Sequence, residues 1–78
     1  MKMTIYSPEK TVFDGEVDMA EFPGGHGRFQ VLKDHDSLIS TLVGGEIRYR
    51  VGKEEFTQPV QSGYVEVHHN VIAVCVHL

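Results

Sequence analysis

The chain has 78 residues and a formal net charge of −4, which fits one small acidic domain. Its seven lysine and arginine residues are scattered, so no basic stripe is present that could neutralise a nucleic-acid backbone. No segment approaches the roughly 18 apolar residues that a membrane-spanning helix needs, and the first residues do not lead into the apolar core of a signal peptide.

Turn-forming residues recur at short intervals and divide the chain into short segments without helical periodicity. Glycine, proline, asparagine and aspartate supply the backbone angles and local hydrogen bonds of such turns. Turns are expected at Ser7–Lys10, Asp14–Gly15, Pro23–Gly27, Lys33–Asp36, Gly44–Gly45, Gly52–Lys53, Ser62–Gly63 and His69–Asn70. The segments between them predict strands at Met3–Tyr6, Thr11–Phe13, Glu16–Phe22, Arg28–Leu32, Leu38–Leu42, Glu46–Val51, Glu54–Thr57, Tyr64–His68 and Val71–Leu78.

Apolar and polar residues alternate in Glu16–Phe22 and Glu46–Val51, which directs one face of each strand to a core and the other to water. The segment Asp36–Val43 also has apolar residues at helical spacing, but its shortness and the lack of a capping box favour a strand. Val71–Val76 is apolar on both faces, so it is expected to lie centrally in a sheet or to have its outer face covered. The pattern as a whole predicts a single all-β domain over residues 1–78.

The chain contains five histidines, namely His26, His35, His68, His69 and His77. Their spacing does not match a structural zinc site, and on a strand the adjacent pair would point to opposite faces. Scattered surface histidines are therefore expected, with no metal ion bound. The lone cysteine, Cys75, lies in an apolar segment and is expected to be a buried free thiol of a reducing compartment.

The glycine-rich segment Pro23–Arg28 follows a strand, as phosphate-binding loops do. It lacks the Gly-Lys-Ser/Thr ending, its glycine spacing misses the dinucleotide motif, and another predicted strand follows it instead of a helix. A hairpin turn is therefore expected. Hydroxyl, imidazole and carboxyl groups occur between Asp34 and Ser40, but no nucleophile elbow frames them, and so small a chain has little room for an active-site pocket. We expect no catalysis, no cofactor and no small-molecule substrate.

A longer segment, Phe22–Ile39, carries a resemblance to a known family. Its residues FPGGHGRFQVLKDHDSLI are similar, in order and spacing, to the signature of the epsilon subunit of F-type ATP synthases: a Pro-Gly turn, Gly-x-Phe/Leu-Gly-Val-Leu, then Pro-Gly-His-Ala-Pro-Leu. Further matching blocks are Ser7–Glu9, Val12–Val17, Gly45–Arg48, Glu55–Phe56, Ser62–Val67 and Asn70–Val71. The resemblance covers essentially the whole chain and is to the N-terminal β-sandwich domain of that subunit.

The resemblance implies a flattened barrel or two-sheet sandwich of about ten short antiparallel strands. It implies a non-catalytic rotor subunit that binds the gamma subunit and the c ring and couples ion-driven rotation to ATP synthesis. Such a subunit would be peripheral, on the cytoplasmic face of the bacterial inner membrane, through the synthase complex. Family members commonly continue into a C-terminal helical hairpin, to which inhibition of ATP hydrolysis is assigned. Residues 1–78 are expected to form the sandwich without that hairpin and without that inhibition.

The resemblance also implies positions for the partner contacts. The residues expected to face the c ring, in two loops lying side by side, are Gly24, Gly25, His26, Gly27, Arg28, Lys33, Asp34 and His35. The residues expected to contribute to the gamma-facing surface are Tyr64, Val65, Val74 and Val76. Core packing is the alternative explanation for these four apolar residues.

Two other functions stay open from the residues alone. A free-standing β-sandwich adaptor would fit the small size and acidity, and its sign would be a groove with exposed aromatic residues or an open sheet edge. An enzyme or metal-binding domain is the third possibility, and stoichiometric zinc in the purified protein would indicate it. The coupling ion and the oligomeric state of the isolated chain stay open as well.

Overall fold

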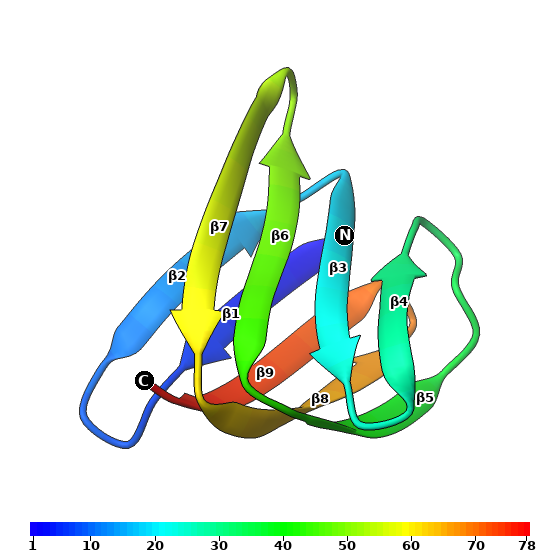
Figure 1. Ribbon diagram of the computed structural model, residues 1–78. Coiled ribbons are helices and arrows are strands. Elements are labelled where there is room, and N and C mark those ends of the chain that lie inside the picture. Colours follow the sequence, from blue (N-terminus) through cyan, green and yellow to red (C-terminus); the bar gives the residue numbers. More distant parts are fainter.

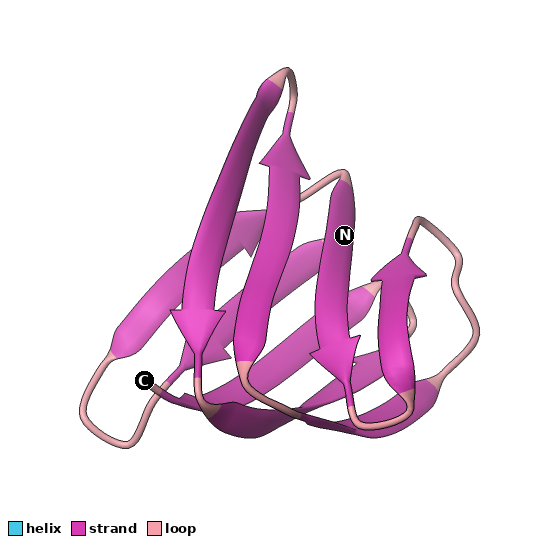
Figure 2. Cartoon of the chain, viewed as in Figure 1, coloured by secondary structure: helices cyan, strands magenta, loops and turns pink.

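The computed structural model describes residues 1–78 and contains strands but no helix (Figures 1 and 2). In chain order the strands are β1 (Lys2–Tyr6), β2 (Thr11–Glu16), β3 (Met19–Gly24), β4 (Gly27–Val31), β5 (Leu38–Leu42), β6 (Gly45–Val51), β7 (Glu54–Val60), β8 (Ser62–His68) and β9 (Val71–His77). The predicted all-β class is confirmed, with nine strands where the resemblance implied about ten. No helix long and apolar enough to cross a membrane is present.

The strands form one curled sheet that folds into two layers (Figure 1). Layer I has the order β2-β1-β9-β8-β5, and layer II has the order β4-β3-β6-β7. The layers join where Gly24 of β3 pairs with Leu42 of β5. Within layer I, β1 runs parallel to β9, while the other neighbouring strands are antiparallel. The arrangement confirms the predicted sandwich.

The hydrophobic core lies between the layers and comes from every second residue of the strands that face it. The largest fully buried side chains include Phe22 of β3 and Ile47 of β6. The predicted central position of the doubly apolar strand is confirmed, because β9 lies between β1 and β8. Its outward-facing residues include Cys75, which is half-buried, so the expectation of a buried thiol is wrong.

The predicted strand Glu16–Phe22 is divided in the structure. Residues Val17 and Asp18 lie between β2 and β3, where the chain crosses from layer I to layer II. The Val17 amide donates to the Met1 carbonyl oxygen at 2.8 Å, and the Asp18 amide donates to the Arg50 carbonyl oxygen at 2.8 Å. Polar and apolar residues keep alternating through Val17 and Asp18, because β2 and β3 present the same face to the core. The sequence pattern therefore does not reveal the crossing.

Two of the predicted turns lie inside strands. Asp14–Gly15 belongs to β2, where these residues pair with Thr4 and Met3 of β1. Ser62–Gly63 belongs to β8, because the chain turns one residue earlier. Gly63 is needed there for a close approach, since a Cβ atom at this position would lie 2.2 Å from the Cys75 carbonyl oxygen. The strand Leu38–Leu42, which was favoured over a helix, is confirmed as β5.

The connections between strands gather at two ends of the sandwich (Figure 1). The lower end, as drawn, holds the β1–β2, β3–β4, β5–β6 and β7–β8 connections. The opposite end, which runs along the top and right side as drawn and is called the upper end here, holds the β2–β3, β4–β5, β6–β7 and β8–β9 connections together with the first residues of the chain. These ends, and the outer faces of the two layers, are the surfaces available to a partner.

Candidate functional site

The first candidate site is the β3–β4 turn at the lower end. Gly24 pairs with Gly27, so Gly25 and His26 form the tip, and both are exposed. A Cβ atom on Gly24 would lie 2.6 Å from the Gly27 carbonyl oxygen, and Gly27 has a φ of +125° that disfavours other residues. The glycine-rich sequence is therefore explained by a tight hairpin, and the predicted turn is confirmed.

Backbone hydrogen bonds attach this turn to β5 in the other layer. The Gly25 amide donates to the Thr41 carbonyl oxygen at 3.0 Å, and the Val43 amide donates to the Pro23 carbonyl oxygen at 2.9 Å. A Cβ atom on Gly25 would lie 2.7 Å from the Thr41 hydroxyl oxygen. The turn is therefore packed directly against the corner that joins the layers.

Arg28 lies beside the turn, on the outer face of layer II. Its Nε donates to the Glu21 carboxylate in an ion pair, and its Nη2 donates to the Glu46 carbonyl oxygen at 2.6 Å. The side chain of Glu21 is 25% exposed and that of Arg28 is 37% exposed. The guanidinium thus connects β4 to β3 and β6, and a shallow hollow of about 290 Å³ lies along it between Glu21 and Gln30.

The second predicted loop, which contains Lys33, Asp34 and His35, lies at the upper end (Figure 1). The full length of β4 separates it from the β3–β4 turn, and five residues of strand extend over about 13 Å. The expectation that the two loops lie side by side is therefore wrong. Consecutive loops on either side of one strand must fall at opposite ends of that strand.

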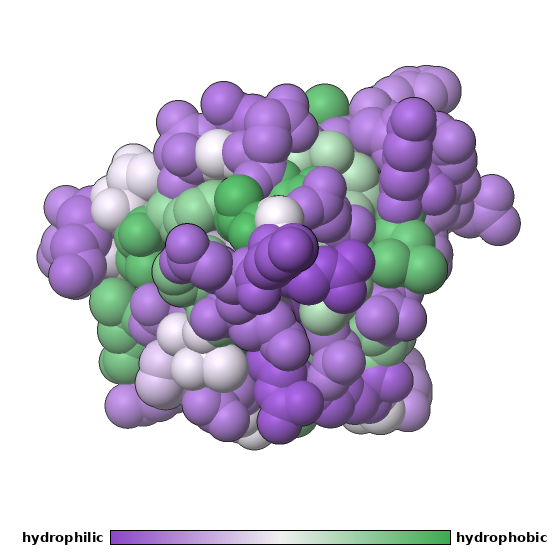
Figure 3. All heavy atoms as spheres, turned by 90° about the horizontal axis from the view of Figure 1, so that it is seen from above, coloured by the Kyte–Doolittle hydropathy of each residue, from purple (hydrophilic) through white to green (hydrophobic).

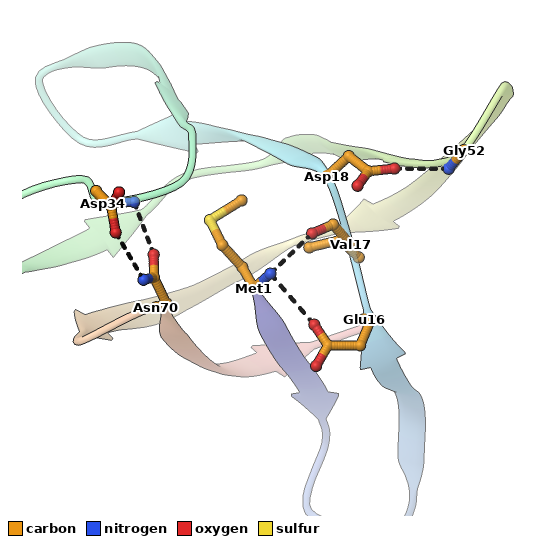
Figure 4. Close-up of polar contacts among 7 residues, drawn as sticks. All are labelled: Met1, Glu16, Val17, Asp18, Asp34, Gly52 and Asn70. Atoms are coloured by element: carbon orange, nitrogen blue, oxygen red, sulfur yellow. Dashed lines mark hydrogen bonds and ion pairs between the residues drawn. The ribbon is translucent and has the colours of Figure 1, made fainter.

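The upper loop is held by polar side chains. The Asp34 amide donates to Asn70 Oδ1 at 2.7 Å, and Asn70 Nδ2 donates to Asp34 Oδ1 at 2.9 Å (Figure 4). His35 Nδ1 donates to the Asp36 carbonyl oxygen at 2.7 Å, and Ser37 Oγ lies 3.0 Å from Nδ1 of His68. A hollow of about 270 Å³ at this loop is lined entirely by polar residues.

Other contacts at the upper end fix the remaining connections (Figure 4). The Met1 ammonium group lies 3.2 Å from the Glu16 carboxylate and donates to the Val17 carbonyl oxygen at 3.1 Å. The Asp18 carboxylate accepts a hydrogen bond of 2.7 Å from the Gly52 amide. Figure 3 looks onto this end and shows a mainly hydrophilic surface. No group of three or more histidine, cysteine, aspartate or glutamate residues is arranged to hold a metal ion.

Three of the four residues expected to face the gamma subunit lie in the core. Val65, Val74 and Val76 have no exposed surface, so they present nothing to a partner and this expectation is wrong for them. Core packing, the alternative explanation, holds for these residues because they fall on the inward-facing positions of β8 and β9. Tyr64, on the outward-facing side of β8, is 50% exposed.

The outer face of layer I carries an apolar patch around Tyr64. Tyr6, Cys75 and Tyr64 form one row across β1, β9 and β8, because each pairs directly with the next. We call this patch the apolar face; it consists of Tyr6, Ile39, Tyr64, Val71, Ala73 and Cys75. The exposed fractions are 74% for Ile39 and 52% for Val71. Such a concentration of exposed apolar groups on one face is typical of an interaction surface.

The apolar face has one charged residue within it: Glu66, which pairs with Ile39 and Ala73, is exposed beside the row of Tyr6, Cys75 and Tyr64. In that row, a hydrogen bond and the charge of Tyr6, followed by the charge of Cys75, raise the pKa of Tyr64 above its ordinary value. At one border, an open groove of about 550 Å³ is lined by Ser37, Leu38, Ile39, Glu66, Val67 and His68. The upper loop therefore reaches the apolar face through Ser37.

The outer face of layer II differs in character. Arg48 of β6 pairs with Glu21 of β3, and Arg50 pairs with Glu55 of β7. Together with Arg28, these residues make a surface of alternating charges that suits contact with water. Layer I is therefore the better candidate for a large protein contact.

Sequence patterns did not identify Tyr6, Ile39 or Cys75 as surface residues. Alternation along Val71–Val76 does contain the signal, since a buried Val74 requires Cys75 to face outward. What the pattern lacks is the pairing that brings Tyr6 next to Cys75, because these residues belong to the first and last strands.

Comparison with known proteins gives one consistent result. Residues 1–77 match the model of the family described as ATP synthase, Delta/Epsilon chain, beta-sandwich domain. The chain is 36% identical over 74 residues to the ATP synthase epsilon chain of Leptospira interrogans, covering 95% of this chain and 58% of that protein. It is 40% identical over 67 residues to the epsilon chain of Syntrophobacter fumaroxidans, covering 86% of this chain and 50% of that one. The chain therefore spans about half the length of these relatives.

Solved structures show the same fold. The chain superimposes with a TM-score of 0.83 on a chain of the Tetrahymena thermophila mitochondrial ATP synthase central stalk and c-ring, at 20% identity, with 100% of this chain and 63% of that chain covered. The TM-score is 0.89 for a chain of the Euglena gracilis mitochondrial ATP synthase, at 17% identity, with coverage of 95% and 48%. At these identities the likeness concerns the fold alone.

Proposed function

Because this chain belongs to the family of β-sandwich domains of ATP synthase delta and epsilon chains, we propose that it is a non-catalytic subunit of the rotor of an F-type ATP synthase. In this role it binds the gamma subunit and the c ring and couples ion-driven rotation to ATP synthesis. The observation that carries the proposal is the family match over residues 1–77. The work is mechanical, and no bond is made or broken by this chain.

The apolar face is the proposed contact with the gamma subunit. Its row of Tyr6, Cys75 and Tyr64 offers two aromatic side chains, which are the kind of residue that dominates binding energy at protein interfaces. A tyrosine phenol is neutral at neutral pH, so covering the ring of Tyr64 does not bury a charge. The groove beside Ile39 extends the contact to Ser37 and His68.

The β3–β4 turn is the proposed contact with the c ring. Its exposed tip, Gly25 and His26, projects from the lower end of the sandwich, away from the upper loop. Polar contacts at such a tip fix orientation more than they add affinity, which suits an interface that must stay in register under torque. We assign Lys33, Asp34 and His35 to the gamma side instead, since their loop borders the apolar face through Ser37.

The proposed location follows from the partners. The chain is peripheral, on the cytoplasmic face of the bacterial inner membrane, and reaches the membrane through the synthase complex. Inhibition of ATP hydrolysis is assigned to a helical hairpin in the family, so residues 1–78 are proposed to couple rotation without inhibiting hydrolysis. Addition of the 78-residue chain to a synthase that lacks its epsilon subunit should leave the hydrolysis rate uninhibited.

Affinity purification from native membranes tests the proposal. Tagged chain should recover the gamma and catalytic subunits in fixed proportion, and a Tyr64→Asp variant should recover much less of both. Recovery of an unrelated soluble partner, with no synthase subunit, would overturn the rotor assignment and favour the adaptor alternative. The same apolar face would then be the adaptor's binding surface.

A further inference from the structure

The guanidinium of Arg28 is already engaged within the chain. Its Nε donates to the Glu21 carboxylate, and its Nη2 donates to the Glu46 carbonyl oxygen. An arginine that donates through both Nε and Nη2 is fixed in orientation as well as in position. Two of its three nitrogen atoms are therefore committed to partners within the chain.

Together with the backbone hydrogen bonds, these contacts hold the β3–β4 turn on several sides. The backbone hydrogen bonds of Gly25 and Val43 connect the turn to β5. Arg28 connects β4, the strand that follows the turn, to β3 and β6. The turn is thereby attached to both layers. A tip that transmits force needs such support, because a freely pivoting hairpin would absorb the displacement.

We propose that Arg28 is an internal strap that stiffens the β3–β4 turn, that Glu21 is the residue that positions it, and that His26 is the side chain offered to the ring. This inference rests on the proposed function only for the identity of the partner. The strap itself is a property of the isolated chain. Glu21 is the better diagnostic residue, because removing its charge breaks the ion pair without removing the guanidinium.

Hydrogen exchange on the whole 78-residue chain tests the strap without any partner. Glu21→Gln and Arg28→Gln should each raise the exchange rate of the Gly25 amide about threefold, the scale set by a partly exposed ion pair. Arg48→Gln is the matched control, since Arg48 also pairs with Glu21 across the sheet but donates to no backbone carbonyl. If the Gly25 amide exchanged at the same rate in Glu21→Gln, Arg28→Gln and Arg48→Gln, the strap would be overturned.

Binding to purified c rings then separates a strap from a direct contact. With the strap, Glu21→Gln and Arg28→Gln weaken ring binding equally, about threefold, and His26→Asp weakens it more. If Arg28 contacted the ring directly, Arg28→Gln would weaken binding while Glu21→Gln, which releases the guanidinium, would preserve or strengthen it. That result would overturn the inference. Failure of the unaltered chain to bind any c ring, with the exchange result intact, would refute the proposed partner and leave the strap standing.

Discussion

Asp34 and Asn70 hold two loops together through a reciprocal pair of hydrogen bonds, although they are 36 positions apart in the sequence. Each residue is a donor to the other, at 2.7 and 2.9 Å. Both have left-handed backbones, with φ of 64° and 62°, which aspartate and asparagine tolerate better than most residues. This pair of hydrogen bonds between Asp34 and Asn70, which we call the clasp, fixes the upper loop against the β8–β9 turn, next to the apolar face.

Replacing Asn70 by glycine should remove the clasp while keeping the backbone conformation. We expect the free energy of unfolding to fall by about 1 kcal/mol, the net value of exposed side-chain hydrogen bonds. Urea denaturation of Asn70→Gly measures this change, and Asn70→Ala should cost more because alanine also disfavours the left-handed backbone. Unchanged stability in both variants would show that the clasp contributes nothing.

Replacing Tyr64 by aspartate should break the proposed contact with the gamma subunit. A charge in the row of Tyr6, Cys75 and Tyr64, with the loss of a half-exposed ring, should weaken binding by about 2 kcal/mol, or roughly 30-fold. Binding is measured on the purified gamma subunit by calorimetry. Arg50→Asp, on the charged outer face of layer II, is the control that should bind normally.

Replacing Val74 by alanine tests whether this residue belongs to the core or to the surface that faces the gamma subunit. A fully buried valine should cost about 2 kcal/mol of unfolding free energy when truncated, because a cavity remains between the layers. Binding of the folded variant to the gamma subunit should equal that of the unaltered chain. A variant of normal stability with weakened binding would show that Val74 is a surface residue after all.

Asp14 should make stability depend on pH in the acid range. A hydrogen bond from Lys2, then the charge of Lys2 and a hydrogen bond from Thr4, lower the pKa of Asp14 below its ordinary value of 3.8. A lowered pKa in the folded state means that the stabilisation is complete above the unfolded pKa and is lost as the pH falls through the folded pKa. Asp14→Asn should therefore lose less stability than the unaltered chain between about pH 7 and pH 3.

Urea denaturation at both pH values measures the difference. The matched control is Glu54→Gln at the tip of the β6–β7 hairpin, since Glu54 makes no ion pair. Its loss of stability on acidification should follow the unaltered chain. Parallel behaviour of Asp14→Asn and the unaltered chain would contradict the prediction.

The fold was predictable because its signals are local. Turn residues and alternating polarity identify the nine strands, and they put Ile47 and Tyr49 on the inward-facing side of β6. The errors occur where a local signal has two meanings. Asp14–Gly15 has turn chemistry, yet it lies within β2, where the carboxylate of Asp14 is held by Lys2 at 3.0 Å.

The site was less predictable because it depends on pairing between distant segments. No local pattern shows that Tyr6 lies next to Cys75, or that Arg28 reaches Glu21 and Glu46. The assignment of Arg28 as an exposed contact came from its place in the motif. Its actual hydrogen bonds became visible only with the register of β3, β4 and β6.

The parallel pairing of β1 with β9 has a consequence for how the chain is made. The first strand lies between β2 and β9, which begins at Val71, so layer I stays incomplete until residues 71–77 have left the ribosome. Nearly all of the domain must therefore be synthesised before it can fold cooperatively. Such distant contacts slow folding, since a long loop closes before they form.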